Sequence, residues 1–341
     1  MFPAWWDPPG LRSVGRMSLA ETLELPPLPG DLKRVERALA AAVEHPDRFL
    51  GDVAGHLVAA GGKRIRPTLT LCAAYAAHGS NRPASEDVVT GAVAVELVHL
   101  GSLYHDDVID EAETRRGVPS VNARWSNIVA ILAGDYLLAR ASGLAASLGA
   151  PVAGLLAATI GELCRGQVLE LQHLFDVGRS EEDYATAIEG KTASLFATAC
   201  RIGGMVSDVD EPTLDALTRF GTHLGLCFQI VDDCLDLTAT DAALGKPAGQ
   251  DLVEGIYTLP VIYALADDPG LSERLGGPLD GERLAEVRVR AAANGAVDAA
   301  LAVARDHATK AGEALTGADT LDAGVCESLG HLVDGLVTRQ S

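Results

Sequence analysis

The chain contains the same acidic cluster twice, each time within an apolar stretch that has helical periodicity. The two clusters are Asp106-Asp107-x-x-Asp110 and Asp232-Asp233-x-x-Asp236. Carboxylates are rarely buried unless they are paired or bind a metal, so two such clusters require shared positive charge. Residues i and i+4 fall on one face of a helix, so the first and last aspartate of each cluster should converge. Such oxygen ligands suit magnesium, which keeps bound waters and bridges to substrate phosphates. Two facing helices could therefore hold a diphosphate through shared metal ions.

Each acidic cluster continues a polar stripe along its own helix. In the stretch 92–110, an apolar stripe predicts the face that packs in the core, and a second stripe contains His99, Ser102, Asp106 and Asp110. The second stretch repeats this spacing with Gly225, Gln229, Asp232 and Asp236. A single acidic pentad is usually a solvated helix face. Two, each with a polar residue aligned beneath and with apolar flanks, favour a two-sided binding site.

Composition favours an all-α fold with a large core. Hydrophobic residues make up 48% of the 341 residues, whereas aromatic residues make up only 4%, and Ala and Leu dominate. This balance favours helix over sheet, and no strand-like alternation is present. The formal net charge of −20 argues against nucleic acid and anionic membrane surfaces as partners. An anionic substrate must therefore be held by local cations or by metal.

The chain divides into an N-terminal arm and one domain. Residues 1–30 are rich in proline and lack both periodicity and the pattern of a signal peptide, so we expect a disordered arm. An over-long gene start, with Met17 as the true start, is one alternative, and a Trp5–Trp6 pair covering a partner subunit is another. From residue 31 to 341 nearly every segment predicts a helix, without a linker that would split the domain.

Neither the cysteines nor the apolar runs indicate a secreted or membrane-spanning chain. The six cysteines have no C-x-x-C pair and lie in apolar helical contexts. We therefore expect free thiols in a reducing cytoplasm. No apolar run looks long enough to span a bilayer, because the best candidate, 128–139, is short and contains Asp135.

Positive charges gather in four short motifs that stand out in so acidic a chain. They are GGKRIRP at 61–67, RRG at 115–117, KT at 191–192 and GKP at 245–247. Arginine suits bidentate contacts with phosphate oxygens, and lysine supplies a point charge. Any one of these motifs alone is usually a surface patch. Together with the acidic clusters they predict phosphate binding.

The acidic and basic motifs together resemble those of the trans-isoprenyl diphosphate synthases (polyprenyl synthetases), in particular the long-chain bacterial type. The first acidic motif occurs in LYHDDVID at 103–110, the second in FQIVDDCLD at 228–236, and the basic motifs follow the family's order and spacing. The resemblance extends from about residue 31 to the C-terminus. It implies an all-α isoprenoid synthase fold, with many helices around a deep apolar cavity, and usually a homodimer.

The resemblance also implies roles for individual residues. A trinuclear magnesium cluster with the allylic diphosphate would be held by Asp106, Asp107, Asp110, Asp232, Asp233 and Asp236. The allylic diphosphate itself would contact Arg115, Lys191, Thr192, Gln229 and Lys246. Isopentenyl diphosphate would contact Lys63, Arg66, His99 and Arg116. The groups closest to the chemistry would be five of those aspartates and three cations, namely Asp106, Asp107, Asp110, Asp232, Asp233, Arg115, Lys191 and Lys246.

The reaction implied is the head-to-tail addition of isopentenyl diphosphate to a farnesyl or geranylgeranyl primer, by magnesium-assisted ionisation, condensation and elimination. Metal and cations would stabilise charge as it develops on the leaving pyrophosphate. One departure from the family pattern is Ile256, where an E-G-K-x-T-x-P segment usually has a second lysine, so a weaker hold on that diphosphate is expected. We expect no transmembrane segment, and the chain could contact a membrane transiently when it releases its product.

In the family that this chain resembles, the residues one turn before the first motif decide where the growing chain meets the floor of the cavity, and so they predict the product length. A helical turn rises about 5.4 Å, so Ser102 lies beneath Asp106, with Gly101 beside it. Bulky residues here would stop elongation, so these small ones predict a product longer than geranylgeranyl, in the hexaprenyl to decaprenyl range. The alternatives are that the small residues only permit close helix packing, and that the enzyme is a short-chain (farnesyl or geranylgeranyl) synthase.

Other readings remain open at this point. A class I terpene cyclase shares the fold, but it usually lacks the second Asp-rich motif and the isopentenyl-binding cations. A non-catalytic subunit of a heteromeric synthase tends to lose its aspartates, and a magnesium-independent binding module would leave six carboxylates unneutralised. Gln167 and Glu170, on an apolar-flanked helix, are weighed equally between cavity lining and packing.

Overall fold

The protein is a single layered bundle of helices, seen here in a computed structural model that describes residues 22–240, 248–279 and 281–337. Its first half contains α2 Leu28–Val43, α3 Arg48–Ala54, α4 His56–Ala59, α5 Ile65–His78, α6 Glu86–Ile109, α7 Val121–Arg124, α8 Asn127–Ser147, α9 Ala150–Gln172 and α10 Glu181–Ile188. A π-helical turn, Glu189–Ala193, then leads into α11 Ser194–Met205 and α12 Glu211–Thr238. The last part contains α14 Gln250–Glu254, α15 Leu259–Asp267, a 3₁₀ turn Pro269–Leu271, α16 Gly281–Ala291, α17 Ala296–Thr316 and α18 Ala323–Val337. The predicted all-α isoprenoid synthase fold is confirmed.

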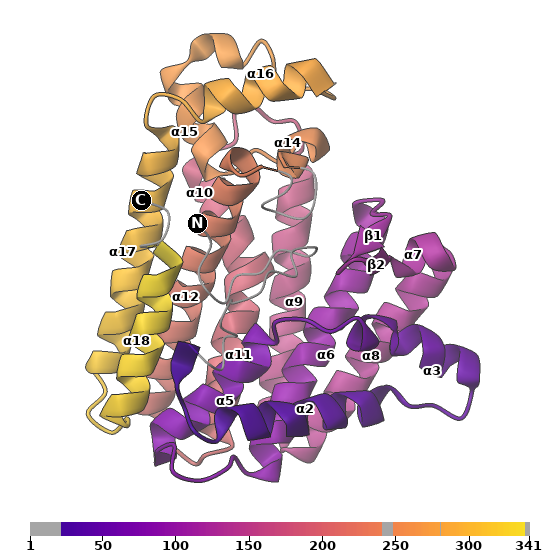
Figure 1. Ribbon diagram of the computed structural model, residues 1–341, viewed down its shortest axis with the longest axis vertical. Coiled ribbons are helices and arrows are strands. Elements are labelled where there is room, and N and C mark those ends of the chain that lie inside the picture. The colour runs from indigo at the N-terminus through magenta and orange to yellow at the C-terminus, as the bar shows by residue number, and fades with distance from the viewer. Residues whose placement is uncertain (1–21, 241–247, 280, 338–341) are drawn as a thin grey trace.

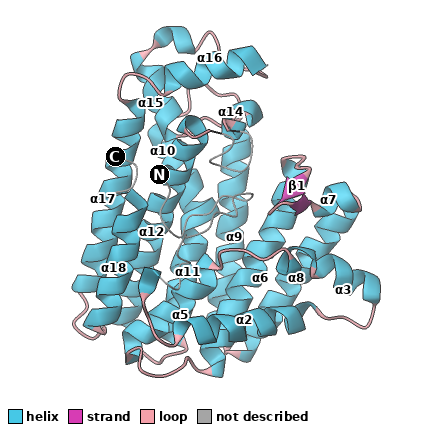
Figure 2. Cartoon of the chain, in the orientation of Figure 1, coloured by secondary structure: helices cyan, strands magenta, loops and turns pink. Residues whose placement is uncertain are grey.

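The long helices pack against one another, and shorter ones close the two ends of the bundle (Figures 1 and 2). Helix α6 packs against α8, α5 and α11, and α12 packs against α11 and α17. Helix α2 crosses one end of the bundle, and α16 crosses the other. The strands within the described residues form one small hairpin, in which β1 (Thr114–Arg115) pairs antiparallel with β2 (Val118–Pro119).

The packed structure begins before the predicted domain start at residue 31. Helix α2 begins at Leu28, and Leu23, Leu25 and Leu28 are 1%, 5% and 0% exposed within the main hydrophobic core. Three buried leucines within ten residues supply apolar contact area that the proline-rich composition did not suggest. Trp5, Trp6 and Met17 lie outside the described residues.

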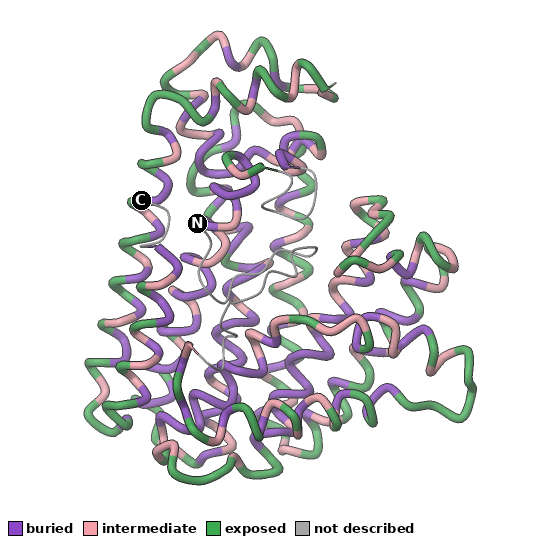
Figure 3. The backbone as a smooth tube through the Cα atoms, viewed as in Figure 1, coloured by how far each residue is buried: buried purple, intermediate pink, exposed green. Residues whose placement is uncertain are grey.

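Three helices are long and apolar enough to cross a membrane by length and composition alone, so the expectation that no apolar run reaches that length is wrong. They are α6, α8 and α9. In α8, Asp135 and Arg140 interrupt the run without lowering its mean hydropathy enough to exclude it. The most apolar part of α6 is 72% buried inside the fold, against 33% for α8 and 22% for α9. Helix α6 is thus a core helix, whereas much of α8 and α9 is exposed (Figure 3). Their exposed residues include the apolar side chains of Ile128, Leu132 and Val168.

The two helices that contain the acidic motifs have N-terminal caps, and both end close to the motifs. The Ser85 hydroxyl accepts from the Val88 N–H to cap α6, and the Asp210 carboxylate accepts from the Thr213 N–H to cap α12. Pro212 lies in the first turn of α12, where its missing N–H costs nothing. Since α6 ends at Ile109 and α12 at Thr238, both acidic motifs lie near the C-terminal ends of long helices.

Candidate active site

The C-terminal end of a helix is an unfavourable place for a carboxylate. The C-terminal end of a helix has partial negative charge, yet α6 ends at Ile109, after Asp106 and Asp107, with Asp110 as its C-terminal cap. Helix α12 ends at Thr238, shortly after Asp236. Neither helix has a basic residue in its last turn. The acidic groups must be compensated from elsewhere, by side chains of other elements or by bound cations.

The first motif is compensated partly by the β1–β2 hairpin that follows it. The hairpin turns the chain back so that Arg115 Nε donates to Asp107 Oδ1 at 2.6 Å. Asp107 is fully buried, and among the described residues its Oδ2 has no hydrogen-bond partner. Burial, and then the like charge of Asp110, raise the pKa of Asp106 to about 6 against the pull of nearby cations. Burial also raises the pKa of Asp110. Burial therefore outweighs the nearby cations at this motif.

The second motif is turned further into the protein. The Tyr184 hydroxyl donates to Asp233 Oδ2 at 2.6 Å, and Gln229 Nε2 donates to Asp233 Oδ1 at 2.7 Å. The Thr192 hydroxyl in turn donates to Gln229 Oε1 at 2.7 Å. Burial raises the pKa of Asp233 to about 7. Asp232 is half-buried. Both oxygens of Asp233 are thus occupied by protein donors, an arrangement that helical spacing could not indicate.

A partly buried ion pair lies between the two motifs. Lys191 Nζ pairs with Glu170, which is 6% exposed on α9. Burial lowers the pKa of Lys191, but Glu170 and Asp106 outweigh it and raise that pKa above its ordinary value. Glu170 in turn raises the pKa of both Asp106 and Asp233. Its electrostatic reach to both motifs places them around a common space. Glu170 therefore belongs with the candidate site residues. In the sequence, only its position on an apolar-flanked helix indicated this.

A π-helical turn presents Lys191 and Thr192 to this space. Such single turns occur frequently at functional sites. A Cβ atom added to Gly166 of α9 would lie 2.3 Å from the Lys191 backbone nitrogen, so only glycine allows α9 to approach this turn so closely. Gly166 fixes the distance between Glu170 and its lysine partner.

The cations predicted to bind isopentenyl diphosphate gather beside the first motif. Burial lowers the pKa of His99 well below its ordinary value, and so do the charges of four arginines, Arg66, Arg116, Arg115 and Arg64. Arg66 is within electrostatic reach of Asp106, and burial lowers its pKa to about 10. Its guanidinium lies 4.9 Å from the centre of the Phe196 ring. Lys63 is half-buried in the loop before α5, and Lys246 lies outside the described residues.

The two chain-length residues face different surroundings. A Cβ atom on Gly101 would lie 3.1 Å from the Gly134 carbonyl oxygen and 3.2 Å from the Leu138 side chain. Gly101 therefore allows α6 and α8 to pack closely, and for this residue the structure supports the packing alternative. Ser102 is half-buried, and its hydroxyl donates to the His99 carbonyl at 2.9 Å.

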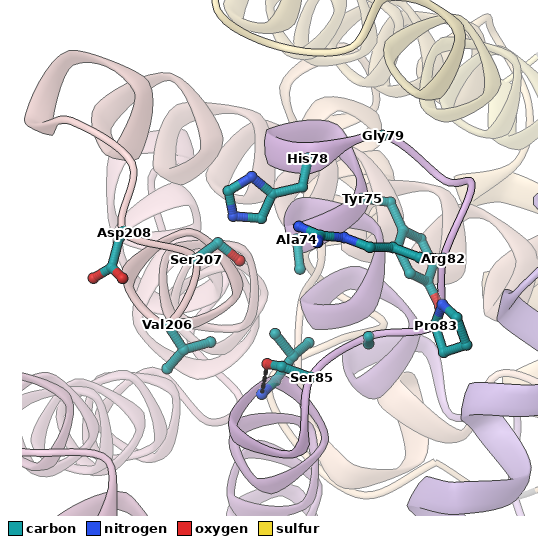
Figure 4. A pocket seen from close by; sticks show the side chains of 12 residues that line it. Ala74, Tyr75, His78, Gly79, Arg82, Pro83, Ser85, Val206, Ser207 and Asp208 are labelled. Carbon is teal, nitrogen blue, oxygen red and sulfur yellow. Dashed lines mark hydrogen bonds between the residues drawn. The ribbon is translucent and has the colours of Figure 1, made fainter.

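A separate hollow lies away from these residues. It has a volume of about 390 Å³ and is lined by Tyr75, His78, Arg82 and Asp208 among others (Figure 4). None of the residues predicted for substrate or metal binding lines it. His78, Arg82 and Asp208 are exposed, so this hollow is a surface groove between the end of α5 and the loop after α11.

The acidic residues do not form a complete metal cage by themselves. Within the described residues, no three His, Cys, Asp or Glu side chains are close enough together to hold one ion. Magnesium rarely needs such a cage, because it binds through one or two carboxylates, waters and substrate phosphates. The buried, unpartnered Asp107 Oδ2 and the raised pKa of Asp106 fit a site that such an ion would complete.

Fold and site together define an all-α prenyltransferase that acts on diphosphates, and sequence comparison confirms the family. The polyprenyl synthetase family model matches residues 47–293, so the chain belongs to the polyprenyl synthetase family. It is 45% identical over 242 residues to heptaprenyl diphosphate synthase component 2 of Geobacillus stearothermophilus, covering 71% of this chain and 74% of that protein. It is 43% identical over 259 residues to nonaprenyl diphosphate synthase of Mycobacterium tuberculosis, covering 75% and 76%.

Solved structures agree with this assignment. A polyprenyl synthase from Caulobacter crescentus, complexed with calcium and isoprenyl diphosphate, superimposes with a TM-score of 0.87 at 33% identity, over 96% of this chain and 100% of that one. A geranylgeranyl pyrophosphate synthase from Corynebacterium glutamicum, also with calcium and isoprenyl diphosphate, gives a TM-score of 0.77 at 40% identity, covering 92% and 96%. The similar proteins thus include both long-chain and short-chain synthases.

Proposed function

We propose that this chain is a trans-polyprenyl diphosphate synthase that joins isopentenyl diphosphate to an allylic diphosphate. The observation that supports this most is the adjacency of two differently charged regions, an acidic space around Asp106 and an arginine group around His99. Arg66 lies within electrostatic reach of both His99 and Asp106. Two diphosphates can therefore bind side by side, one through metal and one directly through arginine.

Magnesium is the proposed metal, bound as a trinuclear cluster with the allylic diphosphate. Asp106, Asp107 and Asp110 would hold it from α6, and Asp232, Asp233 and Asp236 from α12. Each oxygen of Asp233 accepts one protein hydrogen bond, from Tyr184 and from Gln229, and keeps a second lone pair for a metal ion. When bound, magnesium supplies positive charge that stabilises the departing pyrophosphate.

The protein's own residues orient the substrates and compensate charge. In the proposed reaction the allylic C–O bond breaks and its electron pair leaves with pyrophosphate. The isopentenyl double bond then attacks the allylic carbon, a C–C bond forms, and a proton passes to pyrophosphate. Lys191 and Arg115 would stabilise charge on the leaving group, and Thr192 with Gln229 would position it. Lys246 keeps its proposed contact with the allylic diphosphate, and Ile256 would weaken this hold by the loss of one cation.

We propose a product longer than geranylgeranyl, and Ser102 is the residue that tests it. Ser102→Phe should shorten the dominant product to geranylgeranyl or less, because a ring one turn beneath Asp106 would block the growing chain. Mass spectrometry would follow products made from isopentenyl diphosphate and each allylic primer from dimethylallyl to geranylgeranyl. Asp87→Phe, on the same helix but about four turns away at an exposed position, should leave the product length unchanged. A wild-type ladder that stops at geranylgeranyl would reject the long-chain proposal while preserving the mechanism.

A homodimer formed by α8 and α9 is proposed from their exposed apolar face. Ile128 and Leu132 on α8 are 71% and 62% exposed, and Val168 on α9 is 52% exposed. A patch of this kind marks an interaction surface. Leu132→Glu should convert a dimer to monomer in sedimentation equilibrium, whereas Val289→Glu on α16, which is 73% exposed, should not. A monomeric wild-type chain would reject the proposal.

The same purified chain tests the remaining alternatives. One relative is named as a component of a heptaprenyl diphosphate synthase, so a need for a second, different subunit is the alternative to a self-sufficient homodimer in the cytoplasm. Consumption of isopentenyl diphosphate by this chain alone, with magnesium and an allylic primer, would establish self-sufficiency. Release of a cyclic hydrocarbon without isopentenyl consumption would instead indicate a class I terpene cyclase.

A further inference from the structure

Arg64 is the arginine of the GGKRIRP motif for which substrate binding offers no role. Its backbone lies in the left-handed region, with φ of 50°, a conformation that a non-glycine residue adopts only when its surroundings hold it there. The side chain is 4% exposed and turns away from solvent. Arg64 Nε and Nη2 donate to the two carboxylate oxygens of Glu36 on α2, at 2.6 and 3.1 Å. Arg64 Nη1 donates to Glu96 Oε1 on α6 at 3.0 Å.

Glu96 is a buried carboxylate within reach of three arginines. It is 1% exposed, and its Oε1 lies 3.0 Å from Arg64 Nη1 but 3.9 Å from Arg116 Nη2. Its charge also raises the pKa of Arg66, opposing burial. Three arginines and two carboxylates, Glu96 and Glu36, leave an excess of one positive charge. This positive charge can bind an anionic substrate only if Glu96 does not form close ion pairs with Arg66 and Arg116.

The other two arginines are held without a direct hydrogen bond to a carboxylate among the described residues, and Arg116 forms only a longer ion pair with Glu96, at 3.9 Å. Arg116 Nη1 donates to the carbonyls of Leu57, at 3.2 Å, and Gly61, and these neutral partners hold the guanidinium without cancelling its charge. Arg66 lies over the Phe196 ring, and within the described residues its Nε has no hydrogen-bond partner. Both are thus positioned and still charged.

We propose that Arg64 is a positioning residue that binds Glu96 and so keeps Arg66 and Arg116 available for the isopentenyl diphosphate. Arg64 does not touch the substrate itself. Without it, the desolvated Glu96 carboxylate would draw in Arg116, its next nearest cation, and a close ion pair would replace the contact with diphosphate. This inference rests on the proposed function, since it assigns the arginine group to the isopentenyl substrate.

Calorimetric titration with isopentenyl diphosphate, without magnesium or allylic substrate, tests the inference directly. Arg64→Met should weaken binding by about tenfold or more. Adding Glu96→Gln to Arg64→Met should bring the dissociation constant back to within about threefold of wild type, because the competing charge is gone. Glu36→Gln, which alters the half-exposed partner of Arg64, should change binding by less than about twofold. With turnover, the KM for isopentenyl diphosphate should rise in Arg64→Met and the KM for the allylic substrate should not.

The outcomes separate this inference from the proposed function. Wild-type protein that fails to bind isopentenyl diphosphate would reject the function itself. Wild-type protein that binds, together with an Arg64→Met variant of equal affinity or a double variant that does not recover, would reject the role of Arg64. If Arg64→Met does not fold, Arg64→Lys retains a buried cation near Glu96 and should show a smaller loss in the same direction. A rise in both KM values by the same factor would indicate a merely structural role.

Discussion

Asp106→Asn is expected to abolish most activity and at the same time to stabilise the metal-free protein. Asp106 lies at the C-terminal end of α6, where the helix dipole opposes a negative charge. Burial raises its pKa to about 6. As a proposed magnesium ligand it should be needed for ionisation, and its loss should lower kcat/KM by about a thousandfold. The same change removes a desolvated charge, so thermal unfolding without magnesium should occur at a higher temperature than in wild type.

The stability effect should depend on pH in a defined direction. A carboxyl whose pKa is raised by folding destabilises the folded state when it is charged, and this cost shrinks as the pH falls from the folded pKa to the lower pKa of the unfolded chain. The stability gain of Asp106→Asn should therefore be full above about pH 7, should decline as the pH falls below about 6, and should be lost only near the ordinary aspartate pKa of 3.8. Asp52→Asn, at a side chain that is 66% exposed, is the matched control and should show no such gain. A variant that is active, or destabilised without metal at pH 7.5, would contradict the assignment.

The conflict between stability and metal binding at these carboxylates explains why the acidic clusters could be recognised from sequence. Six carboxylates at two helix ends conflict with helix electrostatics and with burial, and a local rule broken twice in the same way indicates a site. Helical periodicity correctly predicts that the two motifs lie on helices, α6 and α12. The fold class follows equally from composition, because few aromatic residues and many helix formers leave little alternative to a bundle.

The residues that sequence reasoning missed act through partners far away in the chain. Tyr184 reaches Asp233 across 49 positions, and Arg64 reaches Glu96 across 32. No periodicity within one helix predicts a contact between two helices. For the same reason the sequence could not separate Gly101, which packs against α8, from Ser102, its neighbour on the next face. The packing of α6 against α8 decides which of these two small residues lies at the contact between the helices.

Lys191→Met is expected to lower both activity and stability, and a second substitution should separate the two effects. Lys191 pairs with the buried Glu170 between the two acidic motifs. Its removal leaves that carboxylate buried without a cation and should cost about 3 kcal/mol of unfolding free energy, visible as a drop of several degrees in melting temperature. It also removes a charge that faces Asp106, so kcat should fall by about a hundredfold or more.

Lys191→Met combined with Glu170→Gln is the decisive variant. Because the stranded carboxylate is gone, the melting temperature should return close to that of wild type. Activity should stay low, since the cation that stabilises pyrophosphate is still missing. Calorimetry and steady-state assays on the same preparations would measure both. If activity returned with stability, Lys191 would be a structural partner of Glu170 alone, and the charge for the leaving group would have to come from Arg115 and the metal.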